Sequence, residues 1–244
     1  MDKTVIKGIP SSLDVFQKAV EETLMEEVLR FFSEVPRAGQ LVDPALEFDT
    51  GYYLAHRIET IHRIRMTAHT DALALAKMIN EDYDLACRWG DYIVEEMKHD
   101  RLFLEDIAMH GYSTQEIIES DPLPSTLALI EYLVDRIKTL GSLPAVAYSI
   151  FVEWNSARTS RAAVQRAASV FGEQYVRGAN AHQEIDEREN HYEEMILIAH
   201  RLTLQRGGVT LVIQLLREIT SLLQSTFKEL DQLKITPRRA STAL

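Results

Sequence analysis

Apolar residues recur at spacings of three and four along almost the whole chain, and this periodicity limits the fold more than any other feature. Such spacing places apolar side chains on one face of each of several successive helices. Strand-like alternation of apolar and polar residues is nowhere sustained. Glycine and proline are scarce, with 10 and 7 residues in a chain of 244. The pattern therefore predicts an all-α fold, a multihelical bundle.

Helix ends are predicted from capping residues and from glycine or proline. The expected helices run from Ser11 or Ser12 to about Phe32, from Pro44 or Asp49 past Met66, from Glu81 or Tyr83 to His110, from Ser125 to about Leu140, from Pro144 toward the break at Gly172, from Ala179 to about Leu204, and from Val209 to Leu233. No linker divides the chain, so residues 1–235 are expected to form a single helical domain. Residues 236–244 are expected to be a disordered tail.

Charge and composition exclude several classes of protein. The formal net charge of -11 would repel a nucleic-acid backbone or an anionic membrane as main partner. No apolar run approaches the roughly 20 residues that span a bilayer, and the first residues carry no apolar signal region. We therefore expect a soluble, cytoplasmic protein. The single cysteine, Cys87, forbids an intrachain disulfide and is expected to be a small buried hydrophobe rather than a nucleophile.

The segment from Ala179 to Glu194 concentrates acids and histidines. On a continuous helix, a narrow arc holds four residues, because successive residues turn by about 100°: His182, Asp186, Glu189 and Glu193. An arc of imidazole and carboxylates without lysine or arginine suits a divalent metal. The alternative is a solvated charged helix, since the other faces of this segment are charged too.

Two earlier segments carry side chains of the same kind. Glu96 and His99 are three residues apart, so both can reach one ion from one helical face. Glu59 and His62 repeat that spacing on the preceding predicted helix. Carboxylates and imidazoles that project into a helical bundle are the ligands expected for paired iron or manganese.

Glu153 ends a run that is apolar on nearly every helical face. A carboxylate there is expected to be at least partly buried, where an unpaired charge is costly. It can bind a metal, form a salt bridge with Arg158 or Arg161, or lie where the helix emerges into water. These readings stay open from the sequence.

The order of these residues resembles that of the heme-oxygenase-like proteins, which include TenA-like, PqqC-like and CADD-like families and diiron oxidases. The resemblance covers most of the chain. It rests on Glu96 and His99 in the stretch Glu-Glu-Met-Lys-His-Asp, on Glu153, and on His182-x-x-x-Asp186. In that group a histidine follows the aspartate after three residues. Here Glu189 stands in that place, and the later His191 would point roughly opposite to His182 on a continuous helix.

The resemblance implies a heme-oxygenase-like fold and O2-dependent oxidation of a small amino acid, amine or fatty acid. It implies one or two iron ions, or manganese, and no heme, because the first helix lacks a histidine. The implied ligands are Glu96, His99, Glu153, His182, Asp186 and Glu189, with Glu59 or His62 as a further contribution.

Other functions remain open on the same fold. One is a metal-independent TenA-like or PqqC-like enzyme. The others are a non-catalytic binder of small molecules and an interaction protein. The Leu/Ile stripe of the last helix fits core packing and also fits a homodimer.

Overall fold

The fold is seen in a computed structural model, which describes residues 12–186, 188, 190–204 and 206–233. The predicted all-α class is confirmed, since the described residues form helices and no strand. The elements are α1 (Leu13–Glu34), η1 (Pro36–Leu41), α2 (Thr50–Glu81), α3 (Tyr83–Glu96), α4 (His99–Met109), α5 (Thr114–Glu119), α6 (Pro124–Leu140), α7 (Leu143–Phe171), η2 (Glu173–Tyr175), α8 (Arg177–Asp186), α9 (His191–Thr203) and α10 (Val209–Leu230).

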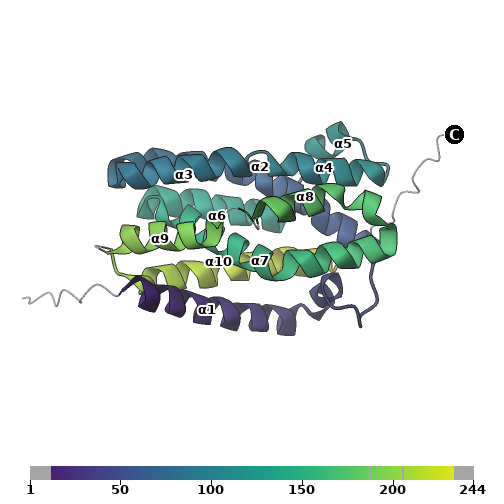
Figure 1. The fold of residues 1–244 in the computed structure, drawn as a ribbon, viewed down its shortest axis with the longest axis horizontal. Coiled ribbons are helices and arrows are strands. Elements are labelled where there is room, and N and C mark those ends of the chain that lie inside the picture. Colours follow the sequence, from purple (N-terminus) through teal and green to yellow (C-terminus); the bar gives the residue numbers. More distant parts are fainter. Residues whose placement is uncertain (1–11, 187, 189, 205, 234–244) are drawn as a thin grey trace, which may run out of the picture.

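The longer helices run along the long axis of the molecule (Figure 1). Helices α3 and α4 follow one another along α2, and both contact it. Helices α9 and α8 lie along α7 in the same way. The bundle therefore contains two long helices, each lined by a pair of shorter ones, and the two chain breaks within these pairs fall near the middle of the bundle.

Several predicted helix ends are confirmed. Ser12 caps α1 by accepting a hydrogen bond from the backbone N–H of Val15. Asp49 caps α2 in the same way through Tyr52. Gly141 follows α6 with a φ of 82°, a conformation that residues with a Cβ rarely adopt. Local residues therefore decide these ends, as expected for caps.

The start of α6 differs from the prediction that Ser125 is its cap. Leu123 is the N-cap residue, and it makes no side-chain cap. The free N–H groups are bound from other helices: Glu59 of α2 accepts from Leu123 N, and Glu229 of α10 accepts from Ser125 N. The Thr126 hydroxyl also donates to Glu59, at 2.7 Å. We call these five residues the α6 cap.

Two predicted helices are interrupted. The expected helix ending at His110 breaks at Met97 and Lys98 into α3 and α4. The expected helix from Ala179 to Leu204 breaks after Asp186, and α9 begins at His191. Both breaks change which side chains share a face, because each new helix sets its own rotation.

The buried apolar residues form two clusters, one toward each end of the bundle. The first includes Trp89, Trp154 and Met195. The second includes Phe103 and Ala179 and continues along α7 beyond Trp154. Helices α3 and α9 therefore belong to the first cluster, and α4 and α8 belong to the second. The polar residues at the breaks after α3 and α8 lie between the two apolar regions.

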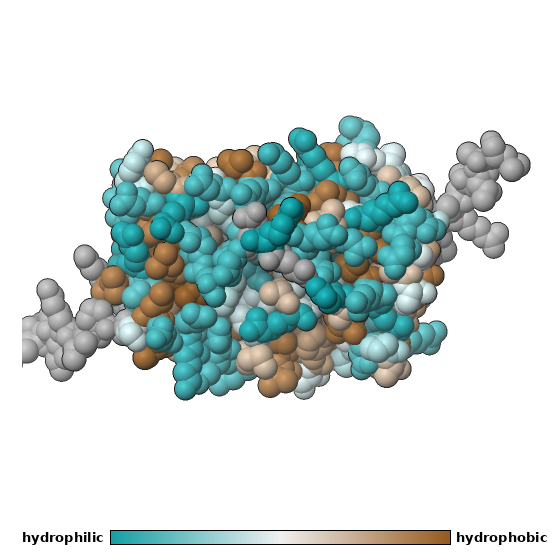
Figure 2. Space-filling view, viewed as in Figure 1, coloured by the Kyte–Doolittle hydropathy of each residue, from teal (hydrophilic) through white to brown (hydrophobic). Residues whose placement is uncertain are grey.

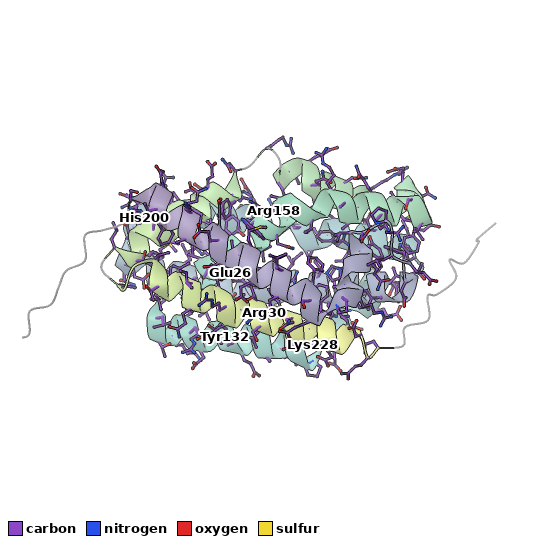
Figure 3. All side chains as sticks on the ribbon, turned by 90° about the horizontal axis from the view of Figure 1, so that it is seen from below. Glu26, Arg30, Tyr132, Arg158, His200 and Lys228 are labelled. Atoms are coloured by element: carbon purple, nitrogen blue, oxygen red, sulfur yellow. The ribbon has the colours of Figure 1, made fainter. Side chains whose placement is uncertain are left out.

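Helix α10 packs within the chain against α1, α6 and α7. Its apolar stripe, which includes Leu215, Leu216 and Ile219, is buried. Seen from below, α1 and α10 lie side by side, with Glu26 and Arg30 on α1 and Lys228 near the end of α10 (Figure 3). The stripe is thus core packing in the folded chain.

The prediction that Cys87 is buried is wrong, because its side chain is exposed on α3. The buried face of this helix includes Leu85, Trp89 and Ile93, and position 87 lies away from that face.

Figure 2 shows hydrophilic residues over most of the face that carries α8 and α9. In the described part of the chain, no helix is both long and apolar enough to cross a membrane.

Candidate metal centre

The break between α3 and α4 brings Glu96 and His99 together. Glu96 is the last residue of α3 and His99 the first of α4. The Nδ1 atom of His99 lies 3.1 Å from Oε2 of Glu96. Burial alone would lower the pKa of His99, but the hydrogen bond and charge of Glu96 raise it above its usual value. With Nδ1–H donating to Glu96, the Nε2 lone pair stays available to a ligand.

Glu153 projects from the middle of α7 and is buried, with 7% of its surface exposed. The hydroxyl of Tyr92 donates to its Oε1 atom at 2.9 Å. Burial raises the pKa of Glu153 well above its usual value, and the nearby charges of Glu96 and Asp186 raise it further. Arg158, one expected salt-bridge partner, instead lies over the ring of Trp154 at 4.0 Å. The carboxyl group therefore lies in an acidic, poorly solvated place.

Helix α8 supplies His182 and Asp186. Its first turn is fixed by Asp106, whose carboxylate accepts the N–H groups of Gly178 and Ala179, each at 2.8 Å. A Cβ atom at Gly178 would lie 1.8 Å from the carbonyl oxygen of Leu102, so α8 can approach α4 this closely only with glycine there. Asp106 and Gly178 thus set the position of α8 relative to α4, and with it the position of His182.

Two hydrogen bonds orient Asp186. His182 Nδ1 lies 3.1 Å from its Oδ2 atom, and the Ser156 hydroxyl donates to the same oxygen at 2.8 Å. Burial would raise the pKa of Asp186, but His182, Ser156 and the charge of His99 hold it below its usual value. Both contacts fall on Oδ2, and the Oδ1 atom is buried with no described hydrogen-bond partner.

The break after α8 corrects the expected orientation of His191. This residue is buried at the start of α9, and its Nδ1 atom lies 3.6 Å from Glu96 and 3.8 Å from Glu153. It points toward the other candidate ligands, not away from them, because the helix does not continue from His182. Its Nε2–H donates to Glu95 at 2.9 Å, which leaves the Nδ1 lone pair toward the centre.

These side chains form two groups with metal-ligand spacing. Ligand atoms of Glu96, His99 and His182 all lie within 4.8 Å of one another, and so do those of Glu96, Glu153 and His191. Glu96 belongs to both, as a carboxylate that bridges two ions would.

Unpaired polar atoms provide a test of whether a metal fits. Among the described residues, the buried side-chain atoms without a hydrogen-bond partner include Glu96 Oε1, Asp186 Oδ1 and His191 Nδ1. Leaving such atoms unpaired costs about 1–3 kcal/mol each. Glu96 and His191 belong to the groups with metal-ligand spacing, and the charge of Asp186 acts on Glu153 beside them. The donor set therefore fits divalent ions of the iron or manganese type.

The other expected ligands have different surroundings. Glu59 belongs to the α6 cap, and His62 Nε2 lies 3.0 Å from the hydroxyl of Ser120. Neither residue is in the two groups described above. Glu189 lies outside the described residues, as does the predicted tail at 236–244.

The sequence reasoning missed four residues around the centre: Tyr92, Glu95, Ser156 and Asp71. Tyr92 and Glu95 could have been found from the sequence, because both are close to Glu96. Tyr92 is four residues before it, and Glu95 is directly before it. Asp71 had none, because it comes from α2 and approaches only through tertiary packing. Burial and the charge of Glu96 raise the pKa of Asp71 to about 8.

A cavity of about 230 Å³ opens onto this centre. Glu96, Glu153, His182 and Asp186 line one part of it. Its wall continues along α1, α2, α7 and α10 to apolar residues such as Phe31 and Phe227. Its volume is below the roughly 300–1,000 Å³ of pockets for drug-sized ligands, so it suits a small molecule.

Comparison with known proteins gives a likeness in structure alone. No protein-family model matches the chain, and no curated protein matches it. The chain is similar to a domain of unknown function with a heme oxygenase-like fold from Shewanella denitrificans, with 20% identity and a TM-score of 0.74 over 91% of this chain and 93% of the other. It is also similar to a TenA homolog from Pseudomonas syringae pv. tomato, with 16% identity and a TM-score of 0.68 over 88% and 93%.

Proposed function

On the heme-oxygenase-like fold that the chain has, we propose that it is a non-heme iron enzyme, an O2-dependent oxidase or oxygenase of a small organic substrate. The observation that carries the proposal is the convergence of six ligand side chains from five helices beside a cavity. They are Glu96, His99, Glu153, His182, Asp186 and His191. Two ions that share Glu96 would account for the two overlapping groups.

Bound iron would supply O2 activation and electron transfer, which no side chain of this set provides. The residues of the chain hold the ligands in place. Tyr92 holds Oε1 of Glu153, Ser156 holds Oδ2 of Asp186, and Glu95 holds Nε2 of His191. The opposite atoms of Glu153 and His191, Oε2 and Nδ1, lie 3.8 Å apart, and Oδ1 of Asp186 is buried without a described partner. Hydrogen bonds behind a metal ligand usually leave its other atom available in this way. The apolar part of the cavity wall limits access of water to a bound substrate.

Metal content provides the direct test. Protein purified from iron-supplemented cells is analysed for metals, stripped, and titrated with ferrous iron without oxygen. We expect about two irons per chain in the wild type, and a transient absorption band when O2 is admitted. His182→Ala and Glu153→Gln should lose bound iron, while the α6-cap variant Glu59→Gln should keep it. Unchanged iron in His182→Ala, or no ferrous binding by the wild type, would refute the proposal.

A second candidate is a metal-independent enzyme of the TenA-like kind, favoured by the structural likeness to the TenA homolog. Nucleophilic catalysis by a thiol in the cavity is not open to this chain, because its single cysteine, Cys87, is exposed and is not part of the cavity wall. Catalysis without metal would have to use groups such as Glu153 and Tyr92. Turnover that persists after complete metal removal would select this candidate.

A further inference from the structure

We infer, on the basis of the proposed function, that Arg57 and Arg63 bind the carboxylate of the substrate, which is therefore an organic anion with an apolar body. Both arginines lie on α2, within the wall of the cavity that opens onto the candidate metal centre.

Helix α2 lines the cavity with a polar stripe. The stripe repeats at helical spacing and consists of His56, Arg57, Thr60, Arg63, Thr67 and Asp71. Two apolar residues of α2, Ile64 and Ala68, line the cavity beside this stripe. Arg57 and Arg63 are both half-buried in this wall, so their charged ends lie beside the cavity and not in bulk water.

The ring of Phe103 lies between Arg57 and the candidate ligand His182. The guanidinium group of Arg57 is over the ring of Phe103 at 5.1 Å, and that ring lies 5.1 Å from the ring of His182. The Nε atom of Arg57 is buried without a described hydrogen-bond partner. Asp106, on whose pKa the charge of Arg57 acts, already accepts two N–H groups of α8. Arg57 therefore keeps hydrogen-bonding capacity for a ligand.

Arg63 lies near the same part of the cavity. Within the described residues, neither Arg63 nor Arg57 forms a salt bridge with a carboxylate. Burial lowers the pKa of His56 well below its usual value, and the charges of both arginines lower it further. His56, Arg57 and Arg63 all line the same cavity. His56 stays neutral there and adds no third charge.

The charge of the loaded site also requires an anion. Two divalent ions would exceed the carboxylates of Glu96, Glu153 and Asp186 by one positive charge. The two arginines raise that excess to three, and Asp106 beside Arg57 and Glu95 beside His191 reduce it to one. A neutral or cationic substrate would leave this charge unbalanced at a high energy cost. A carboxylate matches the planar fork of arginine and offsets the charge.

Beyond the arginines the cavity wall is apolar and aromatic. It includes Phe31, Phe32, Leu41, Val42 and Phe227. This apolar wall thus accepts the hydrocarbon or aromatic body of the substrate. The substrate's carboxylate, bound by the arginines, then lies between that body and the metal centre. The cavity of about 230 Å³ limits the ligand to a small one.

The test compares hexanoate with two analogues of the same length, hexanamide and hexylamine. Binding is measured by calorimetry in the wild type, in Arg63→Gln and in Arg57→Gln, for metal-free and iron-loaded protein without oxygen. Lys77→Gln is the matched control, since it removes a positive charge from an exposed position of α2 outside the cavity. Arg63→Lys keeps the charge but loses the planar fork. Far-ultraviolet circular dichroism checks that each variant is folded.

We expect iron-loaded wild type to bind hexanoate at least about tenfold more tightly than hexanamide, and hexylamine least. Each arginine variant should lose about 10- to 100-fold in hexanoate affinity, the usual loss for a charged hydrogen bond, while Lys77→Gln loses none. Equal binding of hexanoate and hexanamide, binding of none of the three, or equal loss in Lys77→Gln would overturn the inference. Failure of iron to bind while hexanoate still depends on the arginines would refute only the proposed function.

Discussion

The α6 cap and the candidate metal centre are both clusters of buried polar side chains, yet their hydrogen bonding differs. In the α6 cap, both oxygens of Glu59 accept hydrogen bonds from Leu123 or Thr126. In the centre, Glu96 and Asp186 each keep one buried oxygen without a described partner. Both clusters looked alike in the sequence, as Glu-x-x-His pairs. The difference teaches that the partners of a buried carboxylate, not its burial, separate a structural role from a ligand role.

The largest effect is expected from Glu96→Ala. This change removes the residue that the two ligand groups share, so both ions should be lost together. Elemental analysis after ferrous loading should show less than about a tenth of the wild-type iron, because Glu96 would serve both ions. Retention of one tightly bound iron per chain would show that the groups do not share Glu96.

Glu59→Ala should affect stability and leave metal binding unchanged. The N–H group of Leu123 and the hydroxyl of Thr126 would lose their acceptor. Unpaired buried donors cost about 1–3 kcal/mol each, so the free energy of unfolding should fall by about 2–4 kcal/mol. Urea denaturation of the metal-free protein measures this fall. Normal stability together with lost iron would reverse the roles assigned to the two clusters.

Glu153→Gln should stabilise the metal-free protein at high pH. Burial raises the pKa of Glu153 in the folded state above its unfolded value of 4.5. The Glu153 carboxyl group therefore stays protonated to higher pH in the folded state than in the unfolded state. The free energy of unfolding of the wild type then falls as pH rises above about 4.5. The variant has no such loss and should be more stable than the wild type at pH 8.

Urea denaturation of both proteins in EDTA at pH 5 and pH 8 tests this expectation. The advantage of Glu153→Gln should shrink at pH 5. Glu59→Gln serves as the comparison, because it alters a carboxylate that already has donors and should give no stabilisation at pH 8. If Glu153→Gln is less stable than the wild type at pH 8, the charged form of Glu153 is not disfavoured in the folded protein, and the assignment is wrong.

The smallest effect is expected from Glu95→Gln. Glu95 is 45% exposed and touches the centre only through Nε2 of His191. Loss of its charge should weaken iron binding by about tenfold, the lower end for residues behind a ligand, with little change in stability. Glu194→Gln is a matched control, since Glu194 pairs with Arg88 at the surface. Equal iron affinity in both variants would remove Glu95 from the site.

Much of this protein could be predicted before the structure was seen. The helical class, the start of α1 and the end of α6 follow from local patterns, because periodicity and caps depend on neighbours in sequence. Glu96, His99, Glu153, His182 and Asp186 were singled out by residue type and spacing. The structure brings these five into one region. The reading of Glu59 and His62 as further ligands rested on spacing alone, and their surroundings are those of structural residues.

Other features followed no local rule. His191 was expected to point away from His182, and that inference assumed a helix that in fact ends at Asp186. Cys87 was expected to be buried, and it lies on the exposed side of α3. The cap of α6 comes from Glu59 and Glu229, which lie far away in sequence.

The sequence by itself determined that this chain forms helices, where several of them end, and which residue types can bind a metal. These properties depend on interactions within a few residues of the chain. Only the tertiary structure decided that α8 and α9 are separate helices, that Asp71 approaches Glu96, and that Arg57 faces a cavity. Such outcomes depend on the packing of whole helices, because a rotation or a break in one of them moves every side chain it carries.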